Sequence, residues 1–578
     1  MILQALKEYY DRKAADSGVN MAPEGFERKE LQFLIVIDNE GNFINLEDIR
    51  ERVQNRIVAK SFLLPRSKGR SGIRSYETTF LLWDHIGYVL GLPENDAQAI
   101  KQHQAWLNSL AVLPKELLKD EGVNAVLKFY QNGAVNKAIT SPLIIECLKS
   151  LPCNISFRLV TDLTPVPCRK LIKDYVSMSS TDEVTSPKGT CLVTGEKGVI
   201  ARTHGKTFIN KDSWSLVGFQ KKRGYDSYGK EQGFNAPIIK STEFAYVTAL
   251  NTLLKSGTQR FQVGDTTILF WSEKESSFER DFASFFKKPE KDNPDAGTQR
   301  VKALFKSVFT GTYLEDKGDM RFYILGLSPN AARISVRNWH MGTVLDFATR
   351  IRQYFEDFAI IKPPQEPENY SLFDILTSIA TQGEIEKIPP NLAGDFIRAI
   401  FNGTPYPFSM LPAAIRRFRD DHKEVKPVQA ALIKACLNRY QRFYPDTTQK
   451  EVCFDLDPDQ PSAGYQLGRL FAALEKIQEE ASPTINATIR ERYYGAACAT
   501  PVTVFPILLR LKNHHLAKIE NKGRVVNFER LLGTILSKIQ DFPVYFNLHE
   551  QGRFAIGYYH QRQAFFTPKE TATKDCQE

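Results

Sequence analysis

Residues 321–339, RFYILGLSPNAARISVRNW, decide the fold class of the middle of the chain. Two runs rich in β-branched, aromatic and other apolar side chains flank a short segment of turn-forming residues, which predicts strand, turn, strand. Residues 259–272, QRFQVGDTTILFWS, have the same pattern. Nearer the N-terminus, residues 31–44, LQFLIVIDNEGNFI, predict a strand, a turn at Asp38 to Gly41 and a second short strand. We therefore expect antiparallel hairpins in the N-terminal and middle parts.

Helical periodicity replaces this pattern after about residue 372. Apolar side chains there recur at the spacing that places them on one face of an α-helix. Two stretches show it most clearly: Leu467, Leu470, Phe471, Leu474 and Ile477, and Phe528, Leu531, Leu532, Ile535, Leu536 and Ile539. The predicted fold class is therefore α+β and multidomain, with a mixed α/β N-terminal and middle part followed by a C-terminal α-helical bundle.

The chain is expected to divide into four parts, because its length exceeds that of one ordinary domain. The parts are an N-terminal α+β region at 1–150, a mixed α/β region at 151–371, a helical connector at 372–454 and the C-terminal helical bundle at 455–578. The acidic segment EVCFDLDPDQPSAG, residues 451–464, separates the last two parts.

Three further segments have a local pattern that predicts their structure. Residues 61–76, SFLLPRSKGRSGIRSY, contain glycine and arginine and predict a loop, and helical stretches occupy roughly 80–150. Residues 285–299, FFKKPEKDNPDAGTQ, are polar and contain proline, which predicts a surface insertion or a linker.

Composition indicates a cytosolic globular protein. The 76 basic and 67 acidic side chains give a net charge of +9, so only local patches would bind a polyanion. No run approaches ~18 apolar residues, so no membrane span is expected. The start lacks the apolar core of a signal peptide, and the eight cysteines form no CxxC pair. We expect a cytoplasmic location and no membrane partner.

Motifs for catalysis, metal binding or cofactor binding are weak. Asp455, Asp457 and Asp459 alternate as at the start of a calcium loop, but the later positions of that loop do not match. TGEKGVIA, residues 194–201, lacks the spacing of a phosphate-binding P-loop and predicts a turn. The adjacent His514 and His515 point in different directions on a predicted helix. We therefore expect no catalytic residue, metal or cofactor, although distant carboxylates could still assemble a nuclease.

Basic, glycine-containing loops are the remaining candidates for function. Lys68, Arg70 and Arg74 share one such loop, where small residues let phosphate oxygens approach. A second loop, DSYGKEQGFNAP at 226–237, follows Lys221, Lys222 and Arg223 and contains amides that can recognise a donor and acceptor pattern. The alternative for both loops is ordinary solvated surface charge.

The chain resembles, from its first residue to about 566, the large subunit of type I-C CRISPR effector complexes. The stretches that carry the resemblance are MILQALKEYY (1–10), FLLWDHIGYVLGL (80–92), CLVTGEKGVIARTH (191–204), SYGKEQGFNAP (227–237), FAYVTALNTLL (244–254), QVGDTTILFW (262–271), LGLSPNAARISVRNW (325–339), INATIRERYYGAACATPVTVFPILLRL (485–511) and QGRFAIGYYHQR (551–562).

The resemblance implies a non-catalytic subunit of an RNA-guided surveillance complex used in antiviral defence. Such a subunit lies near the 5′ handle of the CRISPR RNA (crRNA), recognises the protospacer-adjacent motif (PAM) in double-stranded target DNA and aids strand opening during R-loop formation. The implied partners are crRNA, target DNA, the backbone and handle-binding subunits, a small helical subunit and a helicase-nuclease recruited after R-loop formation. The C-terminal bundle then corresponds to the small subunit.

The same resemblance gives the candidate residues their roles. Lys230, Gln232 and Asn235 would contact DNA edges or phosphate, and Phe234 or Tyr228 would stack on a base. Lys68, Arg70, Arg74, Lys221, Lys222 and Arg223 would hold phosphates. The bundle candidates for backbone contact are Arg490, Arg492, Arg510, Lys512, Lys518, Lys522 and Arg524. The alternatives are a nuclease with a helical accessory module and a protein-only scaffold.

Overall fold

The computed structural model describes residues 1–15, 21–53, 56–67, 70, 73–94, 96–179, 187–209, 212–221, 226, 228–263, 265–276, 278–279, 282, 319–331, 333–380, 384, 388–389, 391–420 and 426–566. The chain forms two compact units, Met1–Thr252 and Leu253–Glu578. The predicted fold class is confirmed: the chain is mixed α/β with antiparallel hairpins and ends in a helical region.

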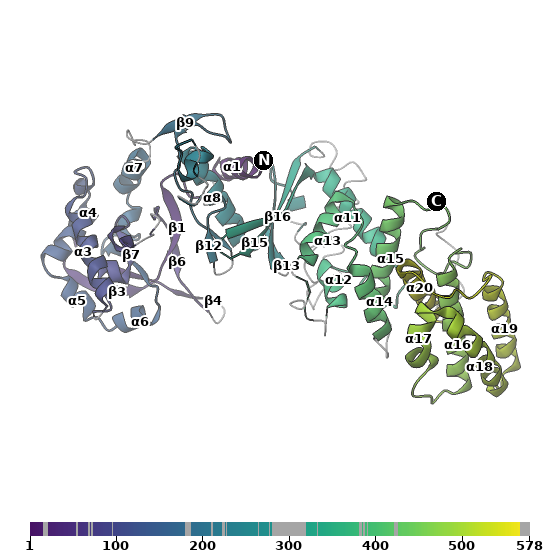
Figure 1. Cartoon of the computed structure of the whole chain (residues 1–578). Helices are drawn as coiled ribbons and strands as arrows, with labels where there is room; N and C mark the ends of the chain where they lie inside the picture. The colour runs from purple at the N-terminus through teal and green to yellow at the C-terminus, as the bar shows by residue number, and fades with distance from the viewer. Residues whose placement is uncertain are drawn as a thin grey trace. The chain divides into compact units, whose positions relative to one another are not determined.

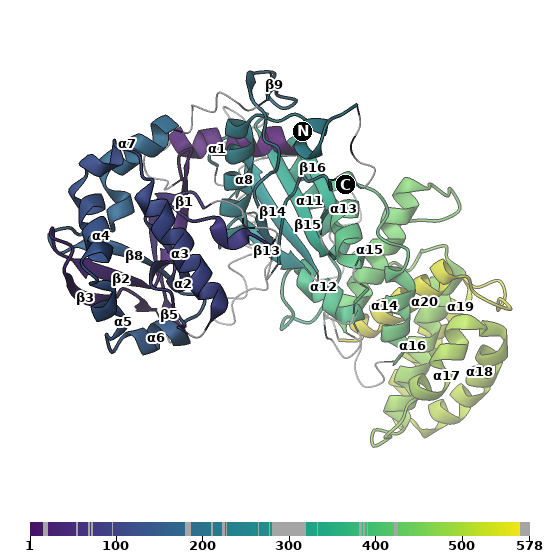
Figure 2. The same cartoon turned by 60° about the vertical axis from the view of Figure 1, so that its left-hand side comes forward.

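A four-stranded mixed sheet forms the centre of the first unit (Figure 2). Its strand order is β3 (Phe43–Asp48), β2 (Phe33–Ile37), β8 (Asn154–Leu159), β7 (Trp83–His85). The predicted hairpin is confirmed, because β2 and β3 pair antiparallel, whereas β2 and β8 pair in parallel. Every residue of β2 is buried, as expected of a strand that is covered on both faces.

Helices cover this sheet and provide most of its core. They are α2 (Ile86–Val89), α3 (Ala97–Ala111), α4 (Glu121–Gln131), α5 (Val135–Ile139), α6 (Ile144–Lys149) and α7 (Lys170–Ser179). Trp106, Phe129 and Phe157 are buried together between the helices and the sheet. The Asp120 carboxylate accepts hydrogen bonds from two backbone N–H groups and so caps the start of α4.

The predicted loop at 61–76 is wrong in its first part. Residues Lys60–Pro65 form strand β6, which pairs antiparallel with β1 (Phe26–Leu31). The apolar side chains of SFLLP explain the difference, because Leu64 is buried against Leu31 and Trp83. The short hairpin β4 (Glu51–Val53) and β5 (Arg56–Val58) precedes this strand.

The N-terminal helix packs with a segment far away in the sequence. Helix α1 (Ile2–Ala15) contacts α8 (Lys240–Lys255) through an edge-to-face pair, in which the ring centroids of Tyr10 and Phe244 lie 5.8 Å apart. Small antiparallel ribbons complete this region: β9 (Lys188–Thr190) with β10 (Lys197–Val199), and β11 (Thr207–Ile209) with β12 (Asp212–Trp214). These ribbons belong to the first unit, which ends at Thr252. The domain boundary at residue 150 stays a prediction.

The second unit begins with a four-stranded antiparallel sheet. Its strands, in order, are β13 (Arg260–Val263), β14 (Thr266–Ser272), β15 (Arg321–Asn330) and β16 (Arg333–Thr343), so both predicted hairpins are confirmed. Phe322 and Ile324 belong to the core that the sheet shares with α11 (Val344–Phe358) and α13 (Leu392–Asn402). The predicted insertion at 285–299 lies outside the described residues.

Among the described residues after β16, most are helical (Figure 1). Besides α11 and α13, these helices are α12 (Leu372–Ile379), α14 (Met410–Asp420), α15 (Pro427–Phe443), α16 (Ala463–Ala481), α17 (Ile489–Ala499), α18 (Pro501–Lys518), α19 (Lys522–Leu536) and α20 (Leu548–Ala564). One apolar core includes buried residues from Phe261 to Tyr559. The domain boundaries at 371 and 454 stay predictions. None of the helices in the described ranges is long and apolar enough to span a bilayer.

Helices α16 and α20 meet through glycines. A Cβ atom on Gly464 or Gly468 would overlap the carbonyl oxygens of Glu550 or Phe554, and one on Gly557 would overlap that of Tyr465. The two helices run in the same direction, because Ser462 contacts Glu550 near their starts and Glu475 contacts Arg562 near their ends. Only glycine permits backbones to approach so closely.

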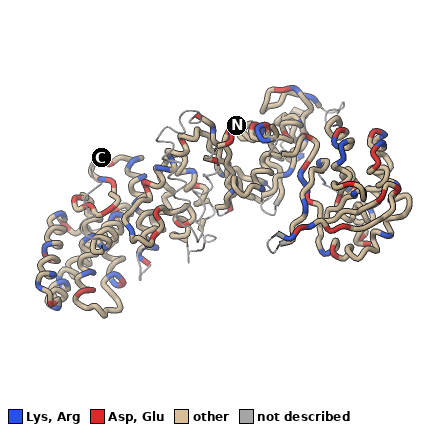
Figure 3. Tube along the Cα trace, turned by 180° about the vertical axis from the view of Figure 1, so that it is seen from behind, with Lys and Arg blue, Asp and Glu red and all other residues tan. Residues whose placement is uncertain are grey.

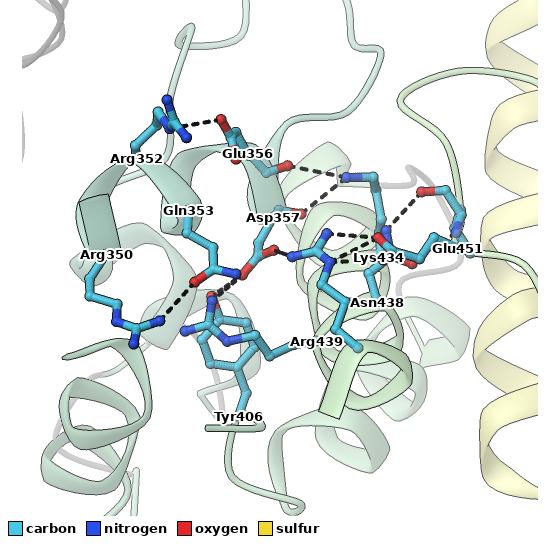
Figure 4. Close-up of polar contacts among 12 residues, drawn as sticks. Arg350, Arg352, Gln353, Glu356, Asp357, Tyr406, Lys434, Asn438, Arg439 and Glu451 are labelled. Carbon is cyan, nitrogen blue, oxygen red and sulfur yellow. Dashed lines mark hydrogen bonds and ion pairs between the residues drawn. The ribbon is translucent and has the colours of Figure 1, made fainter. Parts of the chain in front are cut away.

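A buried carboxylate, that of Asp357, lies at the centre of a network of hydrogen bonds and ion pairs in the second unit (Figure 4). Asp357, at the end of α11, is fully buried and accepts hydrogen bonds from Tyr406 (2.7 Å) and from Arg439 (2.8 Å) and Arg442 (2.6 Å) on α15. Lys434 donates to the Asp357 carbonyl oxygen at 3.2 Å, and burial lowers the pKa of this lysine to about 8. The network therefore ties α15 to α11.

Candidate nucleic-acid interface

The loop at 226–237 is anchored by two of the residues predicted to contact DNA. The Asn235 side-chain amide donates to the carbonyl oxygens of Lys230 and Gln232, both at 3.1 Å. Phe234 is half-buried against a cluster that includes Ile200. These contacts assign Asn235 and Phe234 to the shape of the loop rather than to its surface.

The backbone of the same loop is strained. Tyr228 and Gln232 have φ angles of 50° and 51°, in the left-handed region that non-glycine residues avoid. Among the described non-glycine residues, only Leu82 and Ala331 share this feature. Each such residue costs roughly 1–2 kcal/mol, and residues of this kind concentrate at binding sites. The Tyr228 side chain is 99% exposed and Lys230 is exposed, so the strain presents them to solvent.

Charged side chains surround the base of the loop. Glu231 lies 3.0 Å from the Lys221 ammonium and 3.7 Å from the Arg202 guanidinium. Arg202 also donates through Nε to the Gln232 side-chain oxygen at 2.8 Å. The Gln232 amide N–H groups have no hydrogen-bond partner among the described residues. The Lys230 ammonium likewise forms no ion pair with any described residue.

A pocket of about 150 Å³ adjoins the loop. Its lining residues are Arg202, Thr203, His204, Ser215, Val217, Gly218, Phe219 and Gly233. A side chain at Gly233 would overlap the carbonyl oxygens of Ala201 and Arg202, which explains why glycine occupies this wall. Sequence reasoning missed Arg202, His204 and Phe219, because Phe219 lies in a different segment from Arg202 and His204 and the three form no local motif.

The N-terminal basic loop has only one exposed candidate among the described residues. Arg70 forms an ion pair with buried Asp84, and its guanidinium lies 3.9 Å from the ring centroids of both Phe80 and Tyr88. Arg70 therefore holds this segment together, and its role as a phosphate ligand stays a prediction. Arg74 is exposed, with Glu77 at 3.9 Å.

Three of the phosphate candidates, Lys68, Lys222 and Arg223, lie outside the described residues. Lys221 is described and exposed, and it pairs with Glu231 as stated above.

The bundle candidates also divide into buried and exposed residues. Arg490 is 5% exposed, donates to the Phe418 carbonyl oxygen at 2.8 Å, and lies 5.1 Å from the Tyr494 ring centroid. Its guanidinium is part of the core, and its role as a DNA-backbone contact stays a prediction. Lys512 pairs with Glu529 at 3.4 Å, and Arg524 pairs with Glu480.

The remaining bundle candidates are on the surface. Arg492, Arg510, Lys518 and Lys522 are exposed and form no ion pair within the described residues. Arg510, His514 and Lys518 follow at intervals of four along α18, so they share one face of that helix. Figure 3 shows basic positions recurring along the C-terminal helices, with acidic positions between them.

The aspartates of the rejected calcium motif make ion pairs instead. Asp457 lies 2.8 Å from Lys450, and Asp459 lies 2.9 Å from Lys538. In the part of the chain that the structure describes, no three His, Cys, Asp or Glu side chains are grouped closely enough to hold a metal ion.

A family model described as CRISPR-associated protein (Cas_Csd1) matches residues 6–566. Comparison with curated proteins gave no match. Because the family match covers nearly the whole chain, from α1 to the end of α20, this protein belongs to the Cas_Csd1 family of CRISPR-associated proteins.

Proposed function

We propose that this chain is the non-catalytic large subunit of a type I-C RNA-guided surveillance complex. Membership of the Cas_Csd1 family and the resemblance over residues 1 to about 566 support the proposal. In this role the chain binds near the 5′ handle of crRNA, recognises the PAM in double-stranded DNA and helps to open the strands. It assembles with the backbone, handle-binding and small helical subunits and recruits the helicase-nuclease.

The loop at 226–237 is the observation that carries PAM recognition. Asn235 and Phe234 fix the loop from inside, while Lys230, Tyr228 and Gln232 face outward on a strained backbone. The Lys230 ammonium can contact a phosphate or a guanine edge, and the Gln232 amide can donate to a base acceptor. Recognition of a short DNA motif requires hydrogen-bond donors that point to solvent and are held in place by packed residues behind them.

The exposed basic residues of the bundle have a simpler role. Arg492, Arg510, Lys518 and Lys522 would neutralise phosphates of a DNA strand without reading its sequence. Arg74 would do the same at the N-terminal loop.

The double variant Lys230→Ala/Gln232→Ala should bind PAM-containing duplex DNA about tenfold more weakly in the assembled complex, because one phosphate or base contact and one amide contact are lost. Binding to DNA that is already open at the target should change by less than about twofold, since no duplex then has to be recognised. Titration of fluorescent duplex and bubble DNA measures both. The slope of binding against salt should fall by about one unit for each lost phosphate contact.

The matched control is Lys137→Ala/Gln131→Ala, which removes an exposed lysine and an exposed glutamine from α4 and α5. It should bind both DNAs as the unaltered protein does. Equal losses on duplex and open DNA would reject a role in PAM recognition for the loop.

The purified chain alone should hydrolyse neither DNA nor ATP in the presence of Mg²⁺ or Mn²⁺. Incubation with labelled DNA and ATP measures this. Metal-dependent cleavage that disappears on replacement of one carboxylate would instead support the nuclease alternative. Assembly with the other subunits that needs no RNA and is independent of salt would favour a protein-only scaffold.

A further inference from the structure

The pocket beside the loop combines an aromatic wall with polar groups. Phe219 and Val217 supply apolar surface, and Thr203, Ser215 and His204 supply hydroxyl and imidazole groups. The Ser215 hydroxyl donates to the His204 carbonyl oxygen at 2.8 Å, which joins the two segments that form the pocket. A site with one ring-sized apolar wall and a few fixed polar groups suits a flat heteroaromatic ligand.

His204 has a buried ring nitrogen for which the described part of the chain supplies no hydrogen-bond partner. Its Nδ1 atom is hydrogen-bonded to the Tyr246 hydroxyl, whereas its Nε2 atom has no hydrogen-bond partner among the described residues. Burial lowers the pKa of His204 below its usual range, so the ring is neutral near pH 7. A neutral imidazole donates or accepts at Nε2 according to its tautomer. Buried polar atoms of this kind are usually satisfied, and a ligand group that reached Nε2 would complete its hydrogen bonding.

The volume and the position of the pocket restrict the ligand further. Cavities of about 150 Å³ hold a molecule the size of one benzene ring. Gly233 forms part of the wall and belongs to the loop at 226–237, and Arg202 at the rim is bonded to Gln232 of that loop. A ligand in the pocket would therefore lie directly beside the residues proposed to contact the duplex.

We propose that this pocket binds a single unstacked nucleobase, with its face against Phe219 and its polar edge toward His204. The inference rests on the proposed function, because strand opening is what exposes unpaired bases next to the loop. Stacking on an aromatic side chain tolerates every base, whereas hydrogen bonds at the polar end give a preference for one edge.

The test is a double-mutant cycle on the assembled complex, in which a substitution in the protein is combined with an abasic nucleotide in the nucleic acid. Single abasic nucleotides are placed in turn at each position near the PAM on both DNA strands, and at each position of the crRNA 5′ handle. Binding of each is measured with the unaltered chain and with Phe219→Ala. At one position the abasic nucleotide should weaken binding about tenfold for the unaltered chain and by less than about twofold for the variant.

The strand that shows this coupling identifies the source of the base as target DNA, displaced DNA or crRNA. Phe219→Leu keeps apolar volume and should still lose most of the stacking, so a folding defect is separated from a binding defect. His204→Gln should reduce discrimination between bases at the coupled position about tenfold. Phe208→Ala removes an exposed phenylalanine on β11 that does not line the pocket, and should show no coupling.

Additive effects at every position of all three strands would overturn the proposal. That outcome differs from failure of the proposed function, in which Lys230→Ala/Gln232→Ala would leave the recognition of duplex DNA unchanged.

Discussion

Gly468→Val should destabilise the second unit by about 3 kcal/mol, the upper end of the usual cost of overpacking. The reason is geometric: a side chain at this position of α16 would overlap the backbone of α20 at Phe554 and Tyr558. Side chains can rotate away from an intruding methyl group, but a helix backbone can yield only if the whole helix moves. Unfolding of the full chain by denaturant, followed by circular dichroism, measures the loss.

The matched control is Gly533→Val on α19, where a Cβ atom would meet nothing within 4 Å. Valine has a slightly higher helix propensity than glycine, so this variant should be neutral or gain a few tenths of a kcal/mol. If both variants unfold at the same denaturant concentration, close backbone packing of α16 on α20 does not contribute to stability.

The sequence pattern predicted elements whose pairing is local. Each hairpin lies in one continuous stretch of sequence, with runs of apolar side chains on either side of turn residues, and β15 and β16 pair as that pattern predicts. The parallel pairing of β2 with β8 could not be predicted, because the two strands lie more than a hundred residues apart. The glycines of α16 were missed for another reason: a glycine in a helical pattern indicates a weak helix unless the facing helix is known.

The candidate site was predicted in outline but not residue by residue. The composition of residues 226–237 predicted a loop, but Gln232–Asn235 form a short 3-10 helix within it. The roles of Asn235 and Phe234 depend on contacts with Lys230 and Ile200 that sequence does not reveal. Charge alone was equally ambiguous. Arg70 and Arg490 are arginines of the kind that bind phosphate on a protein surface. In the structure, however, both guanidinium groups lie against aromatic rings.

Asp357→Ala should cost about 3–5 kcal/mol of the free energy of unfolding, because it leaves buried positive charge without its partner. Arg439 is 2% exposed and donates to this carboxylate, as do Arg442 and Tyr406. Asp357→Asn preserves the volume and one oxygen acceptor but removes the charge, so its cost should be intermediate. Denaturant unfolding of the full chain measures both variants.

The neighbouring Glu356 supplies the control that separates burial from charge. Its side chain is exposed and pairs with Arg352 at 3.2 Å, so Glu356→Ala should cost no more than about 1 kcal/mol. Both residues are acidic, lie on α11 and pair with arginine, and they differ chiefly in burial. If the two alanine variants unfold alike, water reaches the carboxylate at 357 and the network does not stabilise the unit. If only Asp357→Ala is strongly destabilised, α15 is held to α11 by a charge that the surrounding core prevents water from replacing.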